Sequence, residues 1–184
     1  MQRTIRMARL CIFCGAHAGT NALYRALARA VAQAVFDRGF GIVYGGGRVG
    51  LMGSLADAML GLGGEVIGVI PRDLAGDEIA HAGVSDLRVV DSMHERKALM
   101  ADLSDGFIAL PGGYGTMDEF HEILTWRQLH IHDKPIGLLN ADGYYDHLLA
   151  LYERMRSEGF VSPGGRELFV SSGAIEDLLR AMGC

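Results

Sequence analysis

The chain has 184 residues, 49% of them hydrophobic, and a formal net charge of −5. This length and apolar content fit one domain over residues 1–184 with a single well-buried core. The acidic balance provides no basic stripe that could displace counterions from a phosphate backbone, which argues against a nucleic acid polymer as the main partner. No apolar run reaches the roughly 18 to 20 residues that a membrane-spanning helix needs, so we expect no membrane partner.

The N-terminal end of the chain is basic but lacks a clear signal-peptide cleavage site. We expect residues 1–8 to form a flexible lead-in. Cys11 and Cys14 form a C-x-x-C pattern inside a predicted strand, where residues three apart face opposite sides of the sheet, which argues against a disulfide or redox pair. With Cys184, which has no obvious mate, these thiols indicate a reducing, cytoplasmic location.

Apolar runs of strand length alternate with amphipathic helical stretches along the whole chain, which predicts an α/β fold. The predicted strands cover residues 10–14, 41–44, 65–70, 86–90, 107–110 and 135–139, with a short last strand at 167–170. The predicted helices cover residues 21–38 (capped by Thr20), 51–60, 92–103, a stretch after Thr116, 144–157 and 174–182. Right-handed crossovers then give a doubly wound parallel sheet with helices on both faces, whose ligands lie beyond the carboxyl ends of the strands.

A glycine loop follows the second predicted strand. Its residues, Gly45-Gly46-Gly47-Arg48-Val49-Gly50, fit the G-x-G-x-x-G pattern of dinucleotide sites. The pattern is weak evidence for NAD or FAD, because glycine is abundant in this chain and the loop follows the second strand instead of the first. The acid expected at the end of the next strand has only Asp73 as a candidate, beyond Pro71.

A basic pair, Arg96 and Lys97, falls near the start of the helix that follows the fourth predicted strand. Ser92 and Glu95 form a capping box there. Cations at a helix N-terminus oppose the helix dipole at a cost of about 0.3 to 1 kcal/mol, which a bound anion would offset. The spacing alone slightly favours an ordinary exposed pair.

A second glycine loop follows the fifth predicted strand and reads Pro111-Gly112-Gly113-Tyr114-Gly115-Thr116-Met117-Asp118-Glu119. Glycines let the backbone approach an anion closely, and the helix that follows adds unpaired N–H donors and the positive end of its dipole. These features predict a phosphate-binding loop with a carboxylate beside it. The same residues also fit a capping box, in which Thr116 caps the helix and Glu119 only reaches back to the cap. The loop by itself leaves both interpretations open.

Taken together and in this order, these motifs resemble the Lonely Guy family of cytokinin riboside 5'-monophosphate phosphoribohydrolases. The motifs are Met93-x-x-Arg96-Lys97, the loop from Pro111 to Glu119, and upstream Gly45-Gly46-Gly47 with Val49-Gly50-Leu51-Met52-Gly53. The likeness runs from about Leu10 to about Tyr152. It implies a Rossmann-like homodimer that hydrolyses a nucleoside 5'-monophosphate such as AMP to a free base and ribose 5-phosphate.

The resemblance also implies residue roles. Arg96 and Glu119 would be the catalytic pair, and the phosphate loop would run from Gly112 through Gly113, Tyr114 and Gly115 to Thr116. Met93, Lys97 and the turn of Gly45, Gly46 and Gly47 would lie in or beside the nucleotide site. Ala16, His17, Arg48 and Asp118 depart from the family's usual residues, which leaves the pair intact but bears on which base is preferred.

The chemistry of the residues agrees with this assignment. Breaking an N-glycosidic bond builds positive charge on the ribose, so a fixed carboxylate beside the sugar lowers the barrier. Glu119, near a helix N-terminus, is expected to be ionised at neutral pH. Arg96 is always protonated and is a poor general acid, so its expected task is to hold the phosphate or sugar and to place Glu119.

Two other function classes remain to be distinguished. A nucleotide or phosphorylated-cofactor carrier needs the glycine loop but not the acid. A lysine decarboxylase needs pyridoxal phosphate on Lys97 or Lys134, the chain's only lysines. We expect no cofactor and no metal, since His121 and His130 lack the i, i+4 spacing of a helical metal site. Trp126 and Leu129 are predicted on the apolar side of a helix that forms core and subunit interface.

Overall fold

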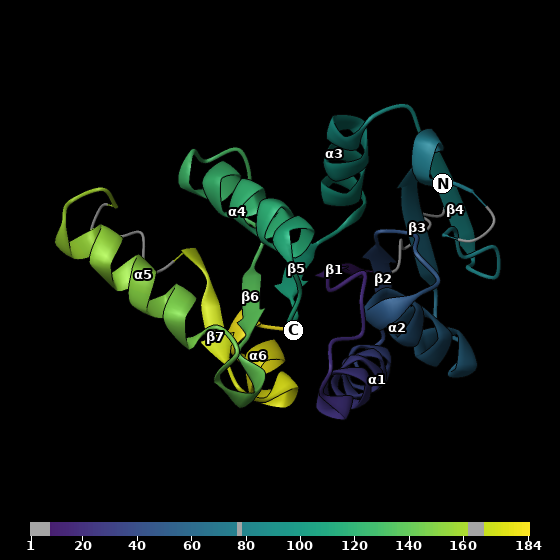
Figure 1. Ribbon diagram of the computed structural model, residues 1–184, viewed down its shortest axis with the longest axis horizontal. Helices are drawn as coiled ribbons and strands as arrows, with labels where there is room; N and C mark the ends of the chain where they lie inside the picture. The colour runs from purple at the N-terminus through teal and green to yellow at the C-terminus, as the bar shows by residue number, and fades with distance from the viewer. Residues whose placement is uncertain (1–7, 77–78, 162–167) are drawn as a thin grey trace, which may run out of the picture.

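The structure is a computed structural model that describes residues 8–76, 79–161 and 168–184. Within these ranges, seven parallel strands form one sheet in the order β4-β3-β2-β1-β5-β6-β7 (Figure 1). The strands are β1 (Arg9–Phe13), β2 (Gly41–Tyr44), β3 (Val66–Pro71), β4 (Asp86–Val90), β5 (Gly106–Ala109), β6 (Ile136–Leu139) and β7 (Val170–Ser172). The helices are α1 (Ala22–Asp37), α2 (Gly50–Gly61), α3 (Met93–Leu103), α4 (Tyr114–Gln128), α5 (Asp146–Ser157) and α6 (Ile175–Met182), with short 3₁₀ helices η1 (Arg72–Leu74) and η2 (Ala141–Gly143).

Successive strands are added to the sheet first on one side of β1 and then on the other. The chain first builds outward from β1 to β4, then returns to place β5 against the free side of β1, with Leu10 beside Gly106 and Phe13 beside Ala109. Such a switch point leaves a crevice at the carboxyl ends of the two central strands. The predicted α/β doubly wound fold is confirmed, and the loops after β1 and β5 lie at that crevice.

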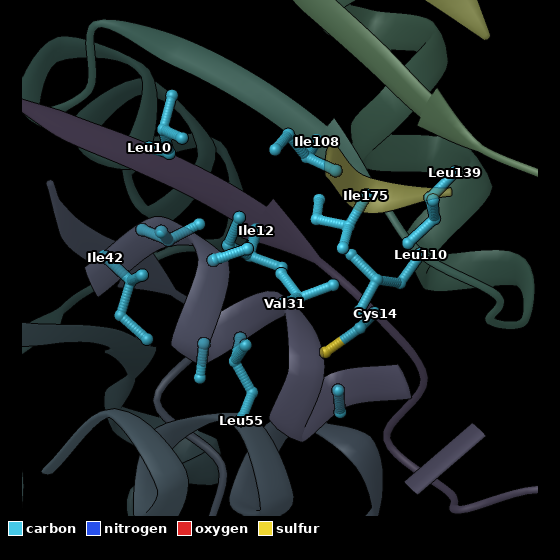
Figure 2. Close-up of a cluster of buried hydrophobic side chains, with 14 of the residues drawn as sticks. Leu10, Ile12, Cys14, Val31, Ile42, Leu55, Ile108, Leu110, Leu139 and Ile175 are labelled. Atoms are coloured by element: carbon cyan, nitrogen blue, oxygen red, sulfur yellow. The ribbon is translucent and has the colours of Figure 1, made fainter. Parts of the chain in front are cut away.

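Two apolar layers cover the sheet, one on each face. Figure 1 shows α1, α2 and α6 on one face and α3, α4 and α5 on the other. In the first layer, Ile12 of β1 and Cys14 just after it pack with Val31 of α1 (Figure 2). Cys11 lies in the opposite layer, so the two cysteines face different sides of the sheet as predicted, and both are buried free thiols.

The helix starts confirm one predicted cap and correct two. Ser92 caps α3 by accepting from the N–H of Glu95, as predicted, although the Glu95 carboxylate accepts from the N–H of Asp91 instead of the cap. Asn21, not Thr20, caps α1, with its side chain accepting from Leu23 N–H, a role to which an asparagine is well suited. Thr116 is not a cap, because α4 begins earlier and Gly113 is its N-cap residue.

The two ends of the chain allow fewer comparisons. The expected flexible lead-in over residues 1–8 falls almost wholly outside the described residues, as does residue 167 of the expected last strand. That strand is found slightly later, at Val170–Ser172. None of the helices in the described ranges has the length and apolar character needed to cross a membrane.

Candidate active site

A cavity of about 680 Å³ lies at the carboxyl ends of the central strands. Residues 14–19 after β1, Gly45 and Gly47 after β2, and residues 111–116 after β5 form its walls. Hydrogen bonds join these walls: Gly15 donates its N–H to Pro111 C=O at 3.2 Å, and Leu51 donates to Gly15 C=O at 3.1 Å. The separate loops therefore form one rigid rim around the cavity.

Arg96 and Glu119 meet in the wall of this cavity. Nη1 of Arg96, on α3, donates to Oε1 of Glu119, on α4, at 2.8 Å, and each residue is only 8% exposed. Nε of Arg96 donates to the carbonyl of Val69 on β3 at 3.0 Å. The guanidinium is thus fixed between a strand and a helix, and it presents Glu119 to the cavity. The expectation of an exposed Arg-Lys pair was wrong, because packing of α3 on the sheet buries Arg96.

The environment of Glu119 differs from the one expected from its sequence position. The carboxylate belongs to the second turn of α4, so it does not close the helix start. Burial raises its pKa above the ordinary 4.5, while the Arg96 charge and hydrogen bond act in the opposite direction. Arg96, with a smaller contribution from the charge of Lys97, therefore favours the ionised form of the buried Glu119 carboxylate.

The glycines after β2 make room for the arginine. A β-carbon on Gly45 would lie 2.2 Å from Nη2 of Arg96, and one on Gly47 would lie 2.8 Å from Cε of Met52. Gly46 has a φ of +77° and packs on Val69 and Ile70, away from the cavity lining. Close packing against Arg96, Met52 and β3 therefore accounts for these three glycines without a dinucleotide.

The glycine loop before α4 has one crowded position and two open ones. A β-carbon on Gly112 would lie 2.1 Å from Oγ1 of Thr116 and 3.0 Å from the nitrogen of Gly15. Gly113 and Gly115 have no atom within 4 Å of such a carbon. The first bond within α4 runs from Met117 N–H to Gly113 C=O, so the N–H groups of residues 114–116 precede the helical ladder. The loop thus offers free space and unpaired donors where a phosphate could bind.

Three other predicted residues occupy different surroundings. Met93 lines the cavity and is 43% exposed, and Tyr114 stands at the rim almost fully exposed. Lys97 is outside the cavity lining, with its ammonium bound to Asp118 at 3.0 Å and Glu122 at 3.1 Å. Lys97 therefore ties α3 to α4 next to the Arg96–Glu119 pair.

The comparisons with known proteins agree with these motifs. A family model described as "Possible lysine decarboxylase" matches residues 52–182. The chain is 52% identical over 177 residues to "Probable cytokinin riboside 5'-monophosphate phosphoribohydrolase LOGL1" of Oryza sativa subsp. japonica, covering 96% of this chain and 79% of that one. It is 44% identical over 182 residues to "Cytokinin riboside 5'-monophosphate phosphoribohydrolase LOG1" of Arabidopsis thaliana, covering 99% and 85%.

The chain belongs to the Lonely Guy family.

The fold of this Lonely Guy chain is shared more widely than its sequence. The molybdenum cofactor binding protein of Rippkaea orientalis has a TM-score of 0.74 at 19% identity, covering 98% of each chain. The molybdenum cofactor carrier protein of Chlamydomonas reinhardtii has a TM-score of 0.72 at 20% identity, covering 97% of each chain. At these identities the likeness establishes the fold alone.

Neither lysine of this Lonely Guy chain suits a Schiff base. Burial alone would lower the pKa of Lys97, but its hydrogen bonds to Asp118 and Glu122 outweigh burial and raise the pKa, which keeps the amine protonated. Nζ of Lys134 donates to the carbonyl of Ala101 at 2.8 Å, far from the glycine loops. Neither lysine therefore places a nucleophilic amine in the cavity, which the activity named in "Possible lysine decarboxylase" would need.

His121 and Trp126 of α4 make contacts within the fold. Over the described ranges, no group of three or more metal-ligating side chains occurs. His121 instead accepts from the Tyr152 hydroxyl at Nε2 and donates from Nδ1 to Met117 C=O, which joins α4 to α5. Trp126 packs against the core as predicted, but Leu129 follows the helix end and is 63% exposed.

Sequence reasoning missed several residues of the cavity wall in this Lonely Guy chain. Tyr24, Met52 and Tyr144 line it. No motif marks the two tyrosines, and Met52 stands in the Val49–Gly53 motif but was given no role there. Tyr144 follows β6, so the rule that loops after parallel strands surround the ligand could have pointed to it. Tyr24 lies on α1 and Met52 on α2. Whether a side chain on a helix faces the cavity depends on how that helix packs against the sheet.

Proposed function

We propose that the chain hydrolyses the N-glycosidic bond of cytokinin nucleoside 5'-monophosphates and of AMP, releasing the free base and ribose 5-phosphate. The buried Arg96–Glu119 pair in the cavity wall is the observation that carries this proposal. A carrier needs donors for the phosphate, but it does not need a desolvated carboxylate held next to them. The names of the rice and Arabidopsis relatives support the same reaction.

Each part of the cavity has a task in this reaction. The N–H groups at the start of α4 and the space beside Gly113 and Gly115 would receive the phosphate. With the phosphate there, the ribose would lie towards Glu119. As the bond from C1' to the base nitrogen breaks, positive charge grows on the sugar and the carboxylate stabilises it. Water then adds to C1', its proton leaves with help from Glu119, and the base takes up a proton.

Arg96 acts through its hydrogen bonds. Because a guanidinium does not release a proton near neutral pH, Arg96 cannot protonate the leaving base. It lowers the energetic cost of ionising Glu119 inside the wall and holds the carboxylate in one place. We assign Arg96 and Glu119 as the catalytic pair and Gly45, Gly47, Met93 and residues 112–116 as substrate contacts. Gly46 and Lys97 support that site from behind its lining.

The test is release of free base from a 5'-monophosphate. Purified protein incubated with AMP or isopentenyladenosine monophosphate should yield adenine or isopentenyladenine together with ribose 5-phosphate, separated by liquid chromatography. The corresponding nucleosides, which lack the phosphate, should react far more slowly. Tight binding of AMP with no adenine released would instead support the carrier. A relative rate for the two nucleotides would rank AMP against the cytokinin substrate.

The assembly and location are proposed on family grounds. We propose that the chain works as a homodimer in the cytoplasm. Light scattering on the purified protein would measure its mass, and a monomer mass at working concentration would contradict the dimer.

A further inference from the structure

Two adjacent tyrosines that follow β6 donate hydrogen bonds to the segment that follows β5. The hydroxyl of Tyr144 donates to the carbonyl of Gly112 at 2.6 Å, and the hydroxyl of Tyr145 donates to the carbonyl of Leu110 at 2.6 Å. Tyr145 is buried, whereas Tyr144 is 42% exposed and lines the cavity. Nothing in the glycine motif itself indicates these partners, which follow β6.

The turn that carries the tyrosines is tightly constrained. Asn140 accepts from the N–H of Tyr145 at 2.6 Å, and its amide donates to Asp146 at 2.8 Å. Asp142 adopts a left-handed φ of 54°, which is uncommon for a residue other than glycine. The ring of Tyr144 meets Tyr145 edge-on with centroids 4.8 Å apart. The hydroxyl of Tyr144 is therefore presented to the loop by a preorganised turn.

The bond from Tyr144 bears on the orientation of one peptide group. The peptide between Gly112 and Gly113 is flanked by two residues that lack β-carbons, so its rotation meets little steric resistance. A rotated peptide would place its carbonyl oxygen, an acceptor with partial negative charge, where donors to a phosphate are needed. Since the C=O and N–H of a trans peptide point in opposite directions, fixing the Gly112 carbonyl also fixes the Gly113 N–H.

We propose that Tyr144 is a positioning residue for substrate binding, which acts by holding the Gly112–Gly113 peptide in the orientation that accepts a phosphate. This inference rests on the proposed function of the site. The Tyr144 hydroxyl donates a hydrogen bond to the Gly112 carbonyl, so its one O–H donor is used within the protein. Tyr145 serves the fold by anchoring the buried carbonyl of Leu110.

The test is the affinity of Tyr144→Phe for ribose 5-phosphate, measured by isothermal titration calorimetry. Loss of one neutral hydrogen bond predicts affinity weaker by about three- to tenfold. The KM for AMP should rise by a similar factor with kcat unchanged, since binding in the ground state and transition state is lost equally. Because Tyr144 is half-exposed and the ring is kept, circular dichroism and the melting temperature should match the wild type.

A matched control comes from the same helix region. Tyr152→Phe also removes a tyrosine hydroxyl, one bonded to His121 and remote from the glycine loop. Its affinity for ribose 5-phosphate should equal that of the wild type. Equal affinity of Tyr144→Phe and wild type would overturn the proposal, as would an equal loss in Tyr152→Phe.

A double-variant cycle tests the peptide rotation itself. Gly113 has a φ of −99° and open space at the β-carbon position, so alanine fits the observed backbone. Its methyl group enters the space proposed for the phosphate and should itself weaken binding, but this loss is common to both alanine proteins and cancels in the cycle. Rotating the peptide would drive this φ towards positive values, which alanine disfavours. The loss caused by Tyr144→Phe should therefore be smaller when residue 113 is alanine. An equal loss in both backgrounds would contradict the proposed mechanism.

These outcomes separate the inference from the function on which it rests. Affinity for ribose 5-phosphate is measured without turnover. A wild type that releases no adenine, with a Tyr144→Phe variant that still binds ribose 5-phosphate more weakly, would reject the hydrolase and support the positioning role. Normal adenine release by the wild type, with unchanged affinity of Tyr144→Phe for ribose 5-phosphate, would support the hydrolase and reject the positioning role.

Discussion

Gly45 and Arg96 fit together so closely that a single methyl group would separate them. A β-carbon at residue 45 would lie 2.2 Å from Nη2 of Arg96, which is closer than any non-bonded contact allows. The guanidinium cannot move away freely, because it is bonded to Val69 and to Glu119. The glycine after β2 is thus part of the same unit as the pair in the cavity wall.

Gly45→Ala should therefore impair catalysis through Arg96. Displacing the guanidinium shifts Glu119, and a shift of about 1 Å in a catalytic group can cost about 10²-fold in rate. Steady-state kinetics with AMP measure the loss. Gly61→Ala is the matched control, because a β-carbon there has no neighbour within 4 Å. Normal turnover in Gly45→Ala would show that the pair tolerates displacement.

Arg96→Lys should lose activity although the positive charge is kept. The guanidinium donates from two different nitrogens to Val69 and Glu119, and a lysine ammonium lacks this planar fork. Loss of one charge-assisted bond in a buried setting predicts a fall in kcat/KM of about ten- to a hundredfold. Kinetics with AMP, together with circular dichroism to confirm folding, test this. Unchanged kinetics would remove Arg96 from the catalytic pair.

Glu119→Gln should bind AMP but fail to cleave it. The amide keeps the shape of the carboxyl and can still accept from Arg96, but it carries no charge to stabilise the sugar cation. Loss of such electrostatic stabilisation predicts a fall in kcat of about 10²- to 10³-fold. Calorimetry gives the affinity and adenine release gives the rate. Turnover close to that of the wild type would show that the carboxylate does not take part.

The activity should depend on pH through Glu119. Burial raises its pKa above 4.5, so the carboxylate is protonated at a pH where an exposed glutamate would be ionised. We expect kcat/KM to decline as the pH falls through this raised pKa. A pH–rate profile with AMP would locate the acid limb. An acid limb below 4.5 would contradict the role of burial.

The stability should depend on pH in the opposite sense. Folded Glu119 holds its proton more tightly than unfolded Glu119, so between the two pKa values the folded state carries more protons and loses stability as the pH rises. The difference in unfolding free energy, wild type minus Glu119→Gln, should therefore fall as the pH rises from below 4.5. Urea unfolding of both proteins at several pH values measures it. A difference that grows with pH would contradict the direction of the shift.

The sequence predicted most of the fold because that information is local. Short apolar runs, glycines and helix caps depend on neighbouring residues, so the strands at Gly41–Tyr44 and Asp86–Val90 were predicted to the residue and the others within a few residues. The errors fell where two local choices compete. Thr116 resembles a cap, yet Gly113 begins the helix earlier and leaves its first N–H groups free.

By itself, the sequence determined an α/β chain with glycine loops after its strands and an acid beside one of them. Only the tertiary structure decided where their side chains lie and which of them meet. Arg96 and Glu119 are 23 positions apart. The family resemblance paired them, but local pattern slightly favoured an exposed cation at Arg96 and left Glu119 open between a helix cap and a functional acid. Packing of α3 and α4 on one face of the sheet buries both and pairs them. Desolvation and pairing arise from contacts between distant segments, so no local pattern could have shown them.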